Sequence, residues 1–392
     1  MNIASRGLTL TIVAALTLLA PASAQTRSGR TETQAARSAR ATSAMVAKEK
    51  EKLNAWTLGL AGGLLEGAPI RLAAEIARVV DDGDNLHVLP IVTRGPTENV
   101  ESLLYLKGVD AAILYADSLE EFKPSVPNIQ QRISYILNLF YSELHVFVRP
   151  EIHSLQDLAG KRVNFNTPGT AAAYSGPLIF SRLGLEVEKT FLPHPVALQQ
   201  MKSGDMAATV WITSKPIDPF VRGRWEPGFK FLPVEYDSRF EDYYLPAELD
   251  AADYPALIGQ GERVGTIAVP TFLAAFNWPK GSDRYRRVAR FVEYLFSRME
   301  TLQGSGFDPK WKEINLTATV PGLVRFPAAQ EWLDRTAAGQ ARDTGSNTAG
   351  RSAGIQIDPA QLRAQAARAA PHDPAEQERL FRKFMEWVRQ QR

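Results

Sequence analysis

The fold class follows from the segment Arg162-Val163-Asn164-Phe165-Asn166-Thr167-Pro168-Gly169-Thr170-Ala171. Residues 162–165 have the apolar alternation of a short strand, residues 166–170 form a polar turn, and a helical pattern continues through residue 183. A strand that passes through a short turn into a helix is the repeating unit of α/β sheets. The segment therefore predicts an α/β domain.

The same unit recurs on both sides of this segment. Further strands are predicted at residues 56–60, 87–92, 109–114, 144–148 and 207–212. The first three alternate with helical patterns and predict one lobe, and the later ones predict a second lobe. Residues 264–276 form a long apolar run that can pass between the lobes.

The two ends of the chain differ from this pattern. Arg6, the uncharged apolar run 8–20 and Ala22-Ser23-Ala24 predict a signal peptide over residues 1–24, cleaved after Ala24, so that the mature protein is periplasmic. Residues 25–52 are predicted as a flexible leader, helical near 45–53. The predicted first lobe comprises residues 53–145 and 270–335, and the second comprises residues 146–269. Residues 336–392 are predicted as a linker, 337–354, followed by a helical tail.

Composition excludes several classes of site. The chain of 392 residues has no cysteine, which excludes disulfides, thiol nucleophiles and Cys-ligated metals. Its formal net charge of +2 gives no reason to expect nucleic-acid binding. The five histidines are scattered without metal-ligand spacing, so we expect no metal site. No nucleophile elbow or phosphate-binding loop is present, and we expect neither catalysis nor a cofactor.

Four strands end in polar or glycine-rich turns, at residues 59–67, 93–99, 166–172 and 213–216. Ligands bind beyond the carboxyl ends of strands in open α/β sheets, and helix N-termini there offer free N–H groups to anions. Each turn taken singly can be an ordinary loop. Together they predict a ligand cleft lined by Gly62, Gly63, Arg94, Gly95, Asn99, Tyr115, Asn166, Gly169, Thr170 and Lys215.

At these turns the chain resembles the solute-binding subunit of tripartite ATP-independent periplasmic (TRAP) transporters, of the TAXI type. The resemblance runs from about residue 56 to 333. It rests on Thr93-Arg94-Gly95-Pro96-Thr97-Glu98-Asn99, on Asn166-Thr167-Pro168-Gly169-Thr170-Ala171, on Ser214-Lys215-Pro216, on Asp157-Leu158-Ala159-Gly160-Lys161-Arg162-Val163 and on Tyr254-Pro255.

The resemblance implies a type II periplasmic-binding-protein fold, with two α/β lobes around a hinge and cleft. It also implies a TRAP-type membrane permease as partner. The chain departs from the family's pattern at Arg94 and Lys215, where small residues are usual. A cationic clamp for a small carboxylate is one interpretation of these two residues, and side chains pointing into solvent is the other. An exported enzyme or a ligand sensor on the same fold is the alternative function.

Overall fold

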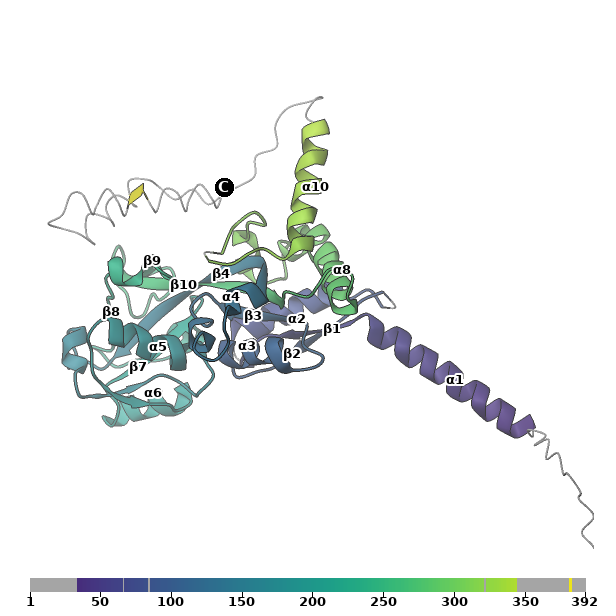
Figure 1. The fold of residues 1–392 in the computed structure, drawn as a ribbon. Coiled ribbons are helices and arrows are strands. Elements are labelled where there is room, and N and C mark those ends of the chain that lie inside the picture. The colour runs from purple at the N-terminus through teal and green to yellow at the C-terminus, as the bar shows by residue number, and fades with distance from the viewer. Residues whose placement is uncertain (1–33, 66, 84, 321, 344–380, 383–392) are drawn as a thin grey trace, which may run out of the picture. The chain divides into compact units, whose positions relative to one another are not determined.

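The computed structural model describes residues 34–65, 67–83, 85–320, 322–343 and 381–382 (Figure 1). They belong to two compact units, one ending at Lys50 and the other beginning at Glu51. Helix α1 (Gln34–Ala55) includes the stretch 45–53 that the sequence predicts as helical, and it begins earlier, at Gln34. The predicted signal peptide and most of the predicted tail lie outside the described residues.

The strands of the second unit form one mixed sheet in the order β2-β1-β3-β10-β4-β7-β5-β6, with β8 beside β4 and β9 beside β10. Their bounds are β1 (Thr57–Ala61), β2 (His87–Ile91), β3 (Ala111–Tyr115), β4 (Ile133–Val148), β5 (Arg162–Asn164), β6 (Glu188–Thr190), β7 (Ala208–Thr213), β8 (Lys230–Leu232), β9 (Leu245–Asp250) and β10 (Arg263–Phe276).

Within this sheet, two long strands connect two groups of parallel strands. β1, β2 and β3 pair in parallel in the first lobe, and β5, β6 and β7 pair in parallel in the second. β4 and β10 pair with each other in antiparallel fashion, while β10 also pairs with β3 and β4 also pairs with β7. These two α/β lobes with shared crossing strands are the predicted type II periplasmic-binding-protein fold. The sequence predicts only residues 144–148 as strand in this region, whereas β4 begins at Ile133 and crosses between the lobes.

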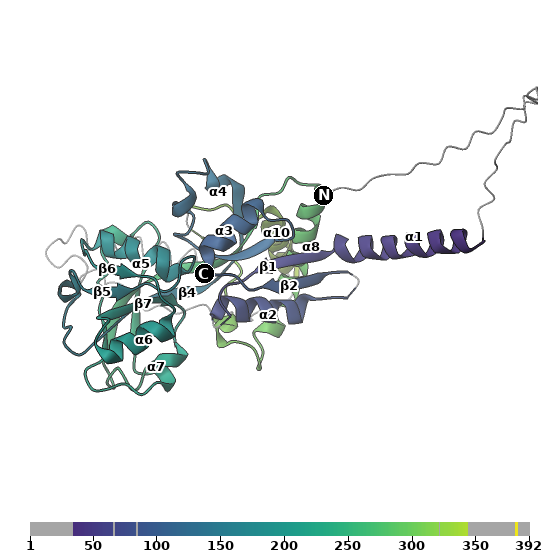
Figure 2. The ribbon, with the colours of Figure 1, turned by 90° about the horizontal axis from the view of Figure 1, so that it is seen from below.

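In each lobe, helices cover both faces of the sheet (Figure 2). The α-helices are α2 (Ala68–Val80), α3 (Pro96–Tyr105), α4 (Ile129–Arg132), α5 (Ala171–Arg182), α6 (His194–Ser203), α7 (Asp218–Arg222), α8 (Asp283–Ser297), α9 (Met299–Leu302) and α10 (Pro327–Asp343). Short 3₁₀ turns are η1 (Glu120–Phe122), η2 (Leu155–Leu158), η3 (Ser238–Phe240) and η4 (Pro309–Glu313).

Three apolar cores hold these layers together. One lies under α2 and α8 in the first lobe and includes Phe291. A second lies under α6 and α7 in the second lobe and includes Met201. The third is continuous across both lobes, from Val100 of α3 to Phe180 of α5. The lobes therefore share buried apolar surface beside the crossing strands.

Helix α10 changes the prediction for the C-terminal segment. It runs to Asp343, so the first residues of the predicted linker are helical. Trp332 and Leu333 pack against the core under α8, and Arg335 forms an ion pair with Glu293 of α8 at 2.7 Å. Alanine is the strongest helix former, and Ala337 and Ala338 continue a helix that already packs on α8. Among the described helices, none combines the length and apolar character needed to cross a bilayer.

Candidate ligand-binding site

The N-terminal ends of α3 and α5, one from each lobe, meet at two glycines. A Cβ atom on Gly95 would lie 2.8 Å from the carbonyl oxygen of Gly169, and one on Gly169 would lie 3.1 Å from the Cβ of Arg94. Both glycines have a positive φ, 137° and 92°. A side chain at either position would strain the backbone and push the lobes apart. The structure thus brings together Arg94, Gly95, Gly169 and Thr170 from two separate predicted turns.

Thr170 caps α5. Its hydroxyl oxygen accepts a hydrogen bond from the Ala173 N–H at 3.3 Å and donates to the Thr167 carbonyl at 2.8 Å. Gly95 occupies the corresponding position before α3 and has no side chain to cap it. The first N–H groups of a helix favour anions. The chemistry suited to this contact is therefore backbone donation to an anionic or polar group.

Asn99 and Gly62 hold the strand ends of the first lobe in place. The Asn99 amide nitrogen donates to the carbonyl oxygens of Gly62 and Ile113 at 2.7 and 2.8 Å. Its oxygen accepts a hydrogen bond from the Thr93 hydroxyl at 2.7 Å. A Cβ on Gly62 would lie 2.9 Å from the Ile70 Cα, so glycine is needed there for α2 to pack. Asn99 and Gly62 therefore fix the backbone at these strand ends, and their polar groups are already hydrogen-bonded within the chain.

Gly63 continues this extended backbone. Its carbonyl oxygen accepts a hydrogen bond from the Thr93 N–H at 3.0 Å, which ties the end of β1 to the turn after β2. A Cβ on Gly63 would touch Pro69 at an ordinary distance of 3.5 Å. Space alone therefore does not require glycine at this position.

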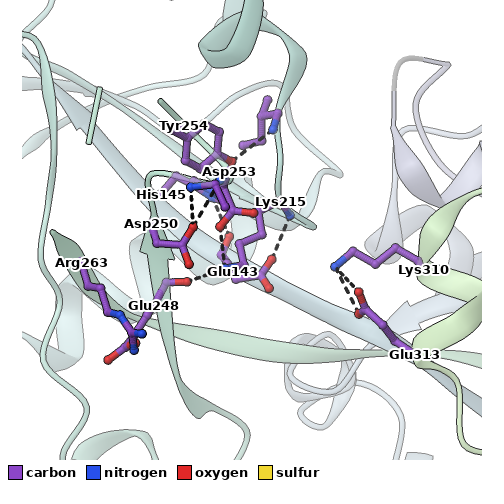
Figure 3. A network of polar contacts seen from close by, with 12 residues as sticks. Glu143, His145, Lys215, Glu248, Asp250, Asp253, Tyr254, Arg263, Lys310 and Glu313 are labelled. Carbon is purple, nitrogen blue, oxygen red and sulfur yellow. Dashed lines mark hydrogen bonds and ion pairs between the residues drawn. The ribbon is translucent and has the colours of Figure 1, made fainter. Parts of the chain in front are cut away.

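The two predicted cations each have a carboxylate partner. The Nε of Arg94 lies 3.1 Å from Glu98, and 64% of the Arg94 side chain is exposed. The Nζ of Lys215 lies 2.6 Å from Asp253 and donates to the Glu248 carbonyl at 2.8 Å (Figure 3). Both side chains are therefore engaged in ion pairs in this structure. Glu98 lies in the same turn as Arg94, whereas Asp253 is distant from Lys215 in the sequence, so the sequence pattern did not connect that pair.

Tyr115 is the last residue of β3, and Asn166 lies two residues after the end of β5. Tyr115 pairs with Thr271 of β10 and is buried, which raises the pKa of its hydroxyl to about 12. Ser142 and Thr271 beside it are hydrogen-bonded to each other at 2.9 Å. Asn166 has a positive φ of 60°, and no described residue hydrogen-bonds its side chain. Asn166 is thus a buried predicted site residue whose polar side chain has no hydrogen-bond partner within the described chain.

A buried polar network at the crossing strands was not predicted (Figure 3). The carboxylate of Glu143 accepts the Lys215 N–H at 3.0 Å. Burial raises the pKa of Glu143 to about 7, and the charge of Lys310 and the Lys215 N–H offset part of this effect. These residues come from β4, the turn after β7 and η4. Their distance along the chain explains why the sequence pattern did not connect them.

His145 and Tyr254 extend this network. The Nε2 of His145 lies 2.8 Å from the Tyr254 hydroxyl, which also accepts the Ile217 N–H at 3.1 Å. The Nδ1 of His145 lies 2.9 Å from the Glu143 carbonyl. These partners fit a neutral ring with its proton on Nδ1, and burial lowers the pKa of His145 to about 3. Tyr254 belongs to the Tyr-Pro pair quoted above, where the sequence offered no structural role for it.

Asp117, in the turn after β3, also went unpredicted. It is fully buried, and its Oδ2 accepts a hydrogen bond from the Tyr244 hydroxyl at 2.8 Å. Tyr243 donates to Glu120, and Lys123 donates to the Tyr243 hydroxyl at 3.2 Å. Tyr243 and Tyr244 follow η3, within the residues predicted as the second lobe. A second polar contact between the lobes therefore lies beyond the end of β3.

A cavity of about 280 Å³ lies at this second contact. It is lined by Ala116, Leu119, Glu120, Lys123, Gln130, Asp242, Tyr243, Gly322 and Leu323. In the described part of the chain, no three His, Asp or Glu side chains are grouped closely enough to hold a metal ion. Three of its polar lining groups, Glu120, Lys123 and Tyr243, already hydrogen-bond one another.

Comparison with known proteins gave similar structures only. No family model and no curated protein matches the chain. The arginine-bound form of truncated ArgBP from T. maritima is 13% identical, with 65% of this chain and 99% of that one covered, at a TM-score of 0.36. The effector binding domain of a BenM variant is 16% identical, with 61% and 94% covered, at a TM-score of 0.35.

A third similar structure is the amino acid ABC transporter substrate-binding protein AbpA from Streptococcus pneumoniae, bound to L-arginine. It is 12% identical, with 66% of this chain and 92% of that one covered, at a TM-score of 0.36. At such low identities and TM-scores, these overlays carry no argument about ligand or activity. The fold assignment rests on the strand order and the crossing strands.

Proposed function

We propose that this chain is a periplasmic solute-binding receptor that captures a small organic molecule between its lobes and delivers it to a TRAP-type permease. The observation that carries the proposal is the contact of α3 and α5 at Gly95 and Gly169. Two lobes joined by long strands can open and close around such a contact. Both positions require glycine at the contact itself, as expected for surfaces that must come close together.

The proposed ligand is a small organic anion, with a carboxylate as the expected group. Helix N-termini stabilise an anion by about 0.3–1 kcal/mol each when exposed, and by up to about 2 kcal/mol when partly buried. Because Arg94 and Lys215 have carboxylate partners, we expect backbone N–H groups and Asn166 to bind the anion instead. The ligand site is therefore proposed at the contact, without a side-chain clamp.

Export and the permease partner rest on the sequence. The pattern over residues 1–24 is that of a signal peptide, and the resemblance to TAXI-type subunits implies the permease. A binding role without catalysis is also a proposal. It is supported by the sequence, which has no nucleophile elbow and no phosphate-binding loop.

Native mass spectrometry of the full chain, purified gently from the periplasm of an expression host, tests the binding proposal. We expect a co-purified small molecule that is released unchanged on denaturation. Release of a chemically altered molecule after incubation would support an enzyme instead. N-terminal sequencing of the same sample tests export, for which we expect a start at Gln25. An intact Met1 on cytoplasmic material would contradict it.

A further inference from the structure

The N-terminal helix α1 (Gln34–Ala55) is exposed to solvent rather than packed on the described cores (Figure 1). Every residue from Arg37 to Ala55 is exposed, and none of the three described cores includes a residue of this helix. Helices in proteins gain most of their stability by packing one face against another surface. The described cores supply no such surface for α1, which is a reason to look for a partner outside the chain.

Two sides of α1 differ in their chemistry. Side chains at helical spacing form a weakly apolar stripe, which consists of Ala39, Thr42, Val46 and Leu53. About half a turn around the helix, a second stripe is basic and consists of Arg37, Arg40, Lys48 and Lys52. The whole helix carries five basic residues and two acidic ones, Glu49 and Glu51. α1 is therefore a cationic helix with modest amphipathic character.

This combination matches a surface of anionic lipid headgroups. Basic amphipathic helices lie in the plane of such surfaces, with the apolar side toward the acyl chains. The apolar stripe of α1 is small, although Val46 is 62% exposed and Met45 beside it is 76% exposed. Charge therefore has to supply most of the attraction, and each Lys or Arg near an anionic bilayer raises the binding constant about fivefold. This attraction reaches about 8–10 Å at ordinary salt concentrations, so it acts across most of the width of a helix.

We propose that α1 binds a membrane surface that contains anionic lipids and holds the rest of the chain beside the bilayer. The short connection to the sheet suits this role, because Trp56 alone separates α1 from β1 and the Thr57 hydroxyl donates to the Leu53 carbonyl at 2.7 Å. A helix fixed at the surface keeps the start of the sheet within a short distance of it. The inference goes beyond the proposed capture of a solute and does not depend on it.

Flotation with lipid vesicles tests the proposal on the full protein as purified from the periplasm of an expression host. One set of vesicles is pure phosphatidylcholine, and the other contains about one third phosphatidylglycerol, which is anionic. We expect the protein to partition at least about tenfold more strongly into the anionic vesicles at low salt. High salt should remove this preference, because it screens the charges. Equal partition into both kinds of vesicle, or none into either, would overturn the proposal.

Neutralising the basic stripe tests the helix itself. The variant replaces four residues with glutamine, a comparably good helix former: Arg37→Gln, Arg40→Gln, Lys48→Gln and Lys52→Gln. The matched control changes the net charge equally at exposed, scattered positions outside α1: Arg222→Gln, Arg263→Gln, Lys280→Gln and Arg286→Gln. We expect the α1 variant to lose at least about 100-fold in partition into anionic vesicles, and the control to stay within about threefold of the parent. An equal loss in both variants would show attraction by net charge alone and refute the role of α1.

A second copy of the chain is the other partner that the apolar stripe of α1 fits. Sedimentation equilibrium without lipid distinguishes the two partners, with Val46→Asp as the variant that places a charge in the stripe. We expect both the parent and Val46→Asp to sediment as monomers. A dimer that Val46→Asp dissociates would assign the helix to self-association and overturn the lipid proposal.

Discussion

Replacing Lys215 with methionine distinguishes a structural ion pair from a ligand clamp. In the structure, 23% of the Lys215 side chain and 18% of the Asp253 side chain are exposed, and their charged atoms are 2.6 Å apart. Removing one partner of a fully buried pair costs about 3–5 kcal/mol, because the other charge is left uncompensated. With this partial exposure, we expect Lys215→Met to lower the free energy of unfolding by about 2–3 kcal/mol. The Glu248 carbonyl also loses its donor.

The matched control is Arg94→Met, which removes a cation from an exposed pair. The Arg94 and Glu98 side chains are 64% and 33% exposed, and such pairs contribute at most about 1 kcal/mol. A double variant, Lys215→Met with Asp253→Asn, should recover part of the lost stability, because no buried charge remains unpaired. Urea unfolding at neutral pH, followed by circular dichroism, gives all four free energies. If Lys215→Met is as stable as the parent and loses ligand affinity, the clamp interpretation is right and the ion-pair reasoning is refuted.

Three further predictions concern closure, pH and the tail. Gly169→Ala should weaken ligand binding about tenfold more than Gly108→Ala. The two glycines have nearly the same positive φ, 92° and 91°, but only Gly169 faces Arg94 across the contact. Equal affinities of the two variants, measured by calorimetry, would contradict this prediction. Burial raises the pKa of Glu143 from 4.5 to about 7, so the folded state binds this proton more tightly than the unfolded state does. The stability gained from proton binding is lost as the pH rises through that range. Glu143→Gln should therefore gain stability relative to the parent, by up to about 3 kcal/mol between pH 5 and 8 in urea titrations, and a constant difference would refute the shift. Truncation after Asp343 should preserve the ligand-induced rise in melting temperature, whereas a folded truncated protein without that rise would show that the tail contributes to binding.

The strand–turn–helix units were predictable because each strand is short and bounded by residues that stop it. Residues 87–92 and 109–114, for example, match β2 and β3 within two residues at each end. β4 was predicted too short because nearly every residue from Ile133 to Val148 is buried. A strand covered on both faces has no alternation of polar and apolar residues to mark its length.

The candidate site was predictable in its backbone and less so in its side chains. Turns and helix starts are local, so Gly95 and Gly169 could be recognised from the residues around them. Partnerships between distant side chains are not local. Lys215 was visible in its turn, but Asp253 lies well beyond it in the chain. Asp117 was visible at the end of a strand, but its hydrogen bond from Tyr244 depends on a residue far along the chain.

The pairing of β3 with β10 has a consequence for the order in which the chain folds. The first lobe needs β10 and α8, because Tyr115 pairs with Thr271 and Phe291 completes the core under α2. Its two parts are separated by the whole second lobe, and such long-range contacts form slowly. The second lobe's own core draws on one continuous stretch, from Phe147 to Val264. We therefore expect the second lobe to fold first and the N-terminal strands to join their sheet later, once β10 and α8 are available.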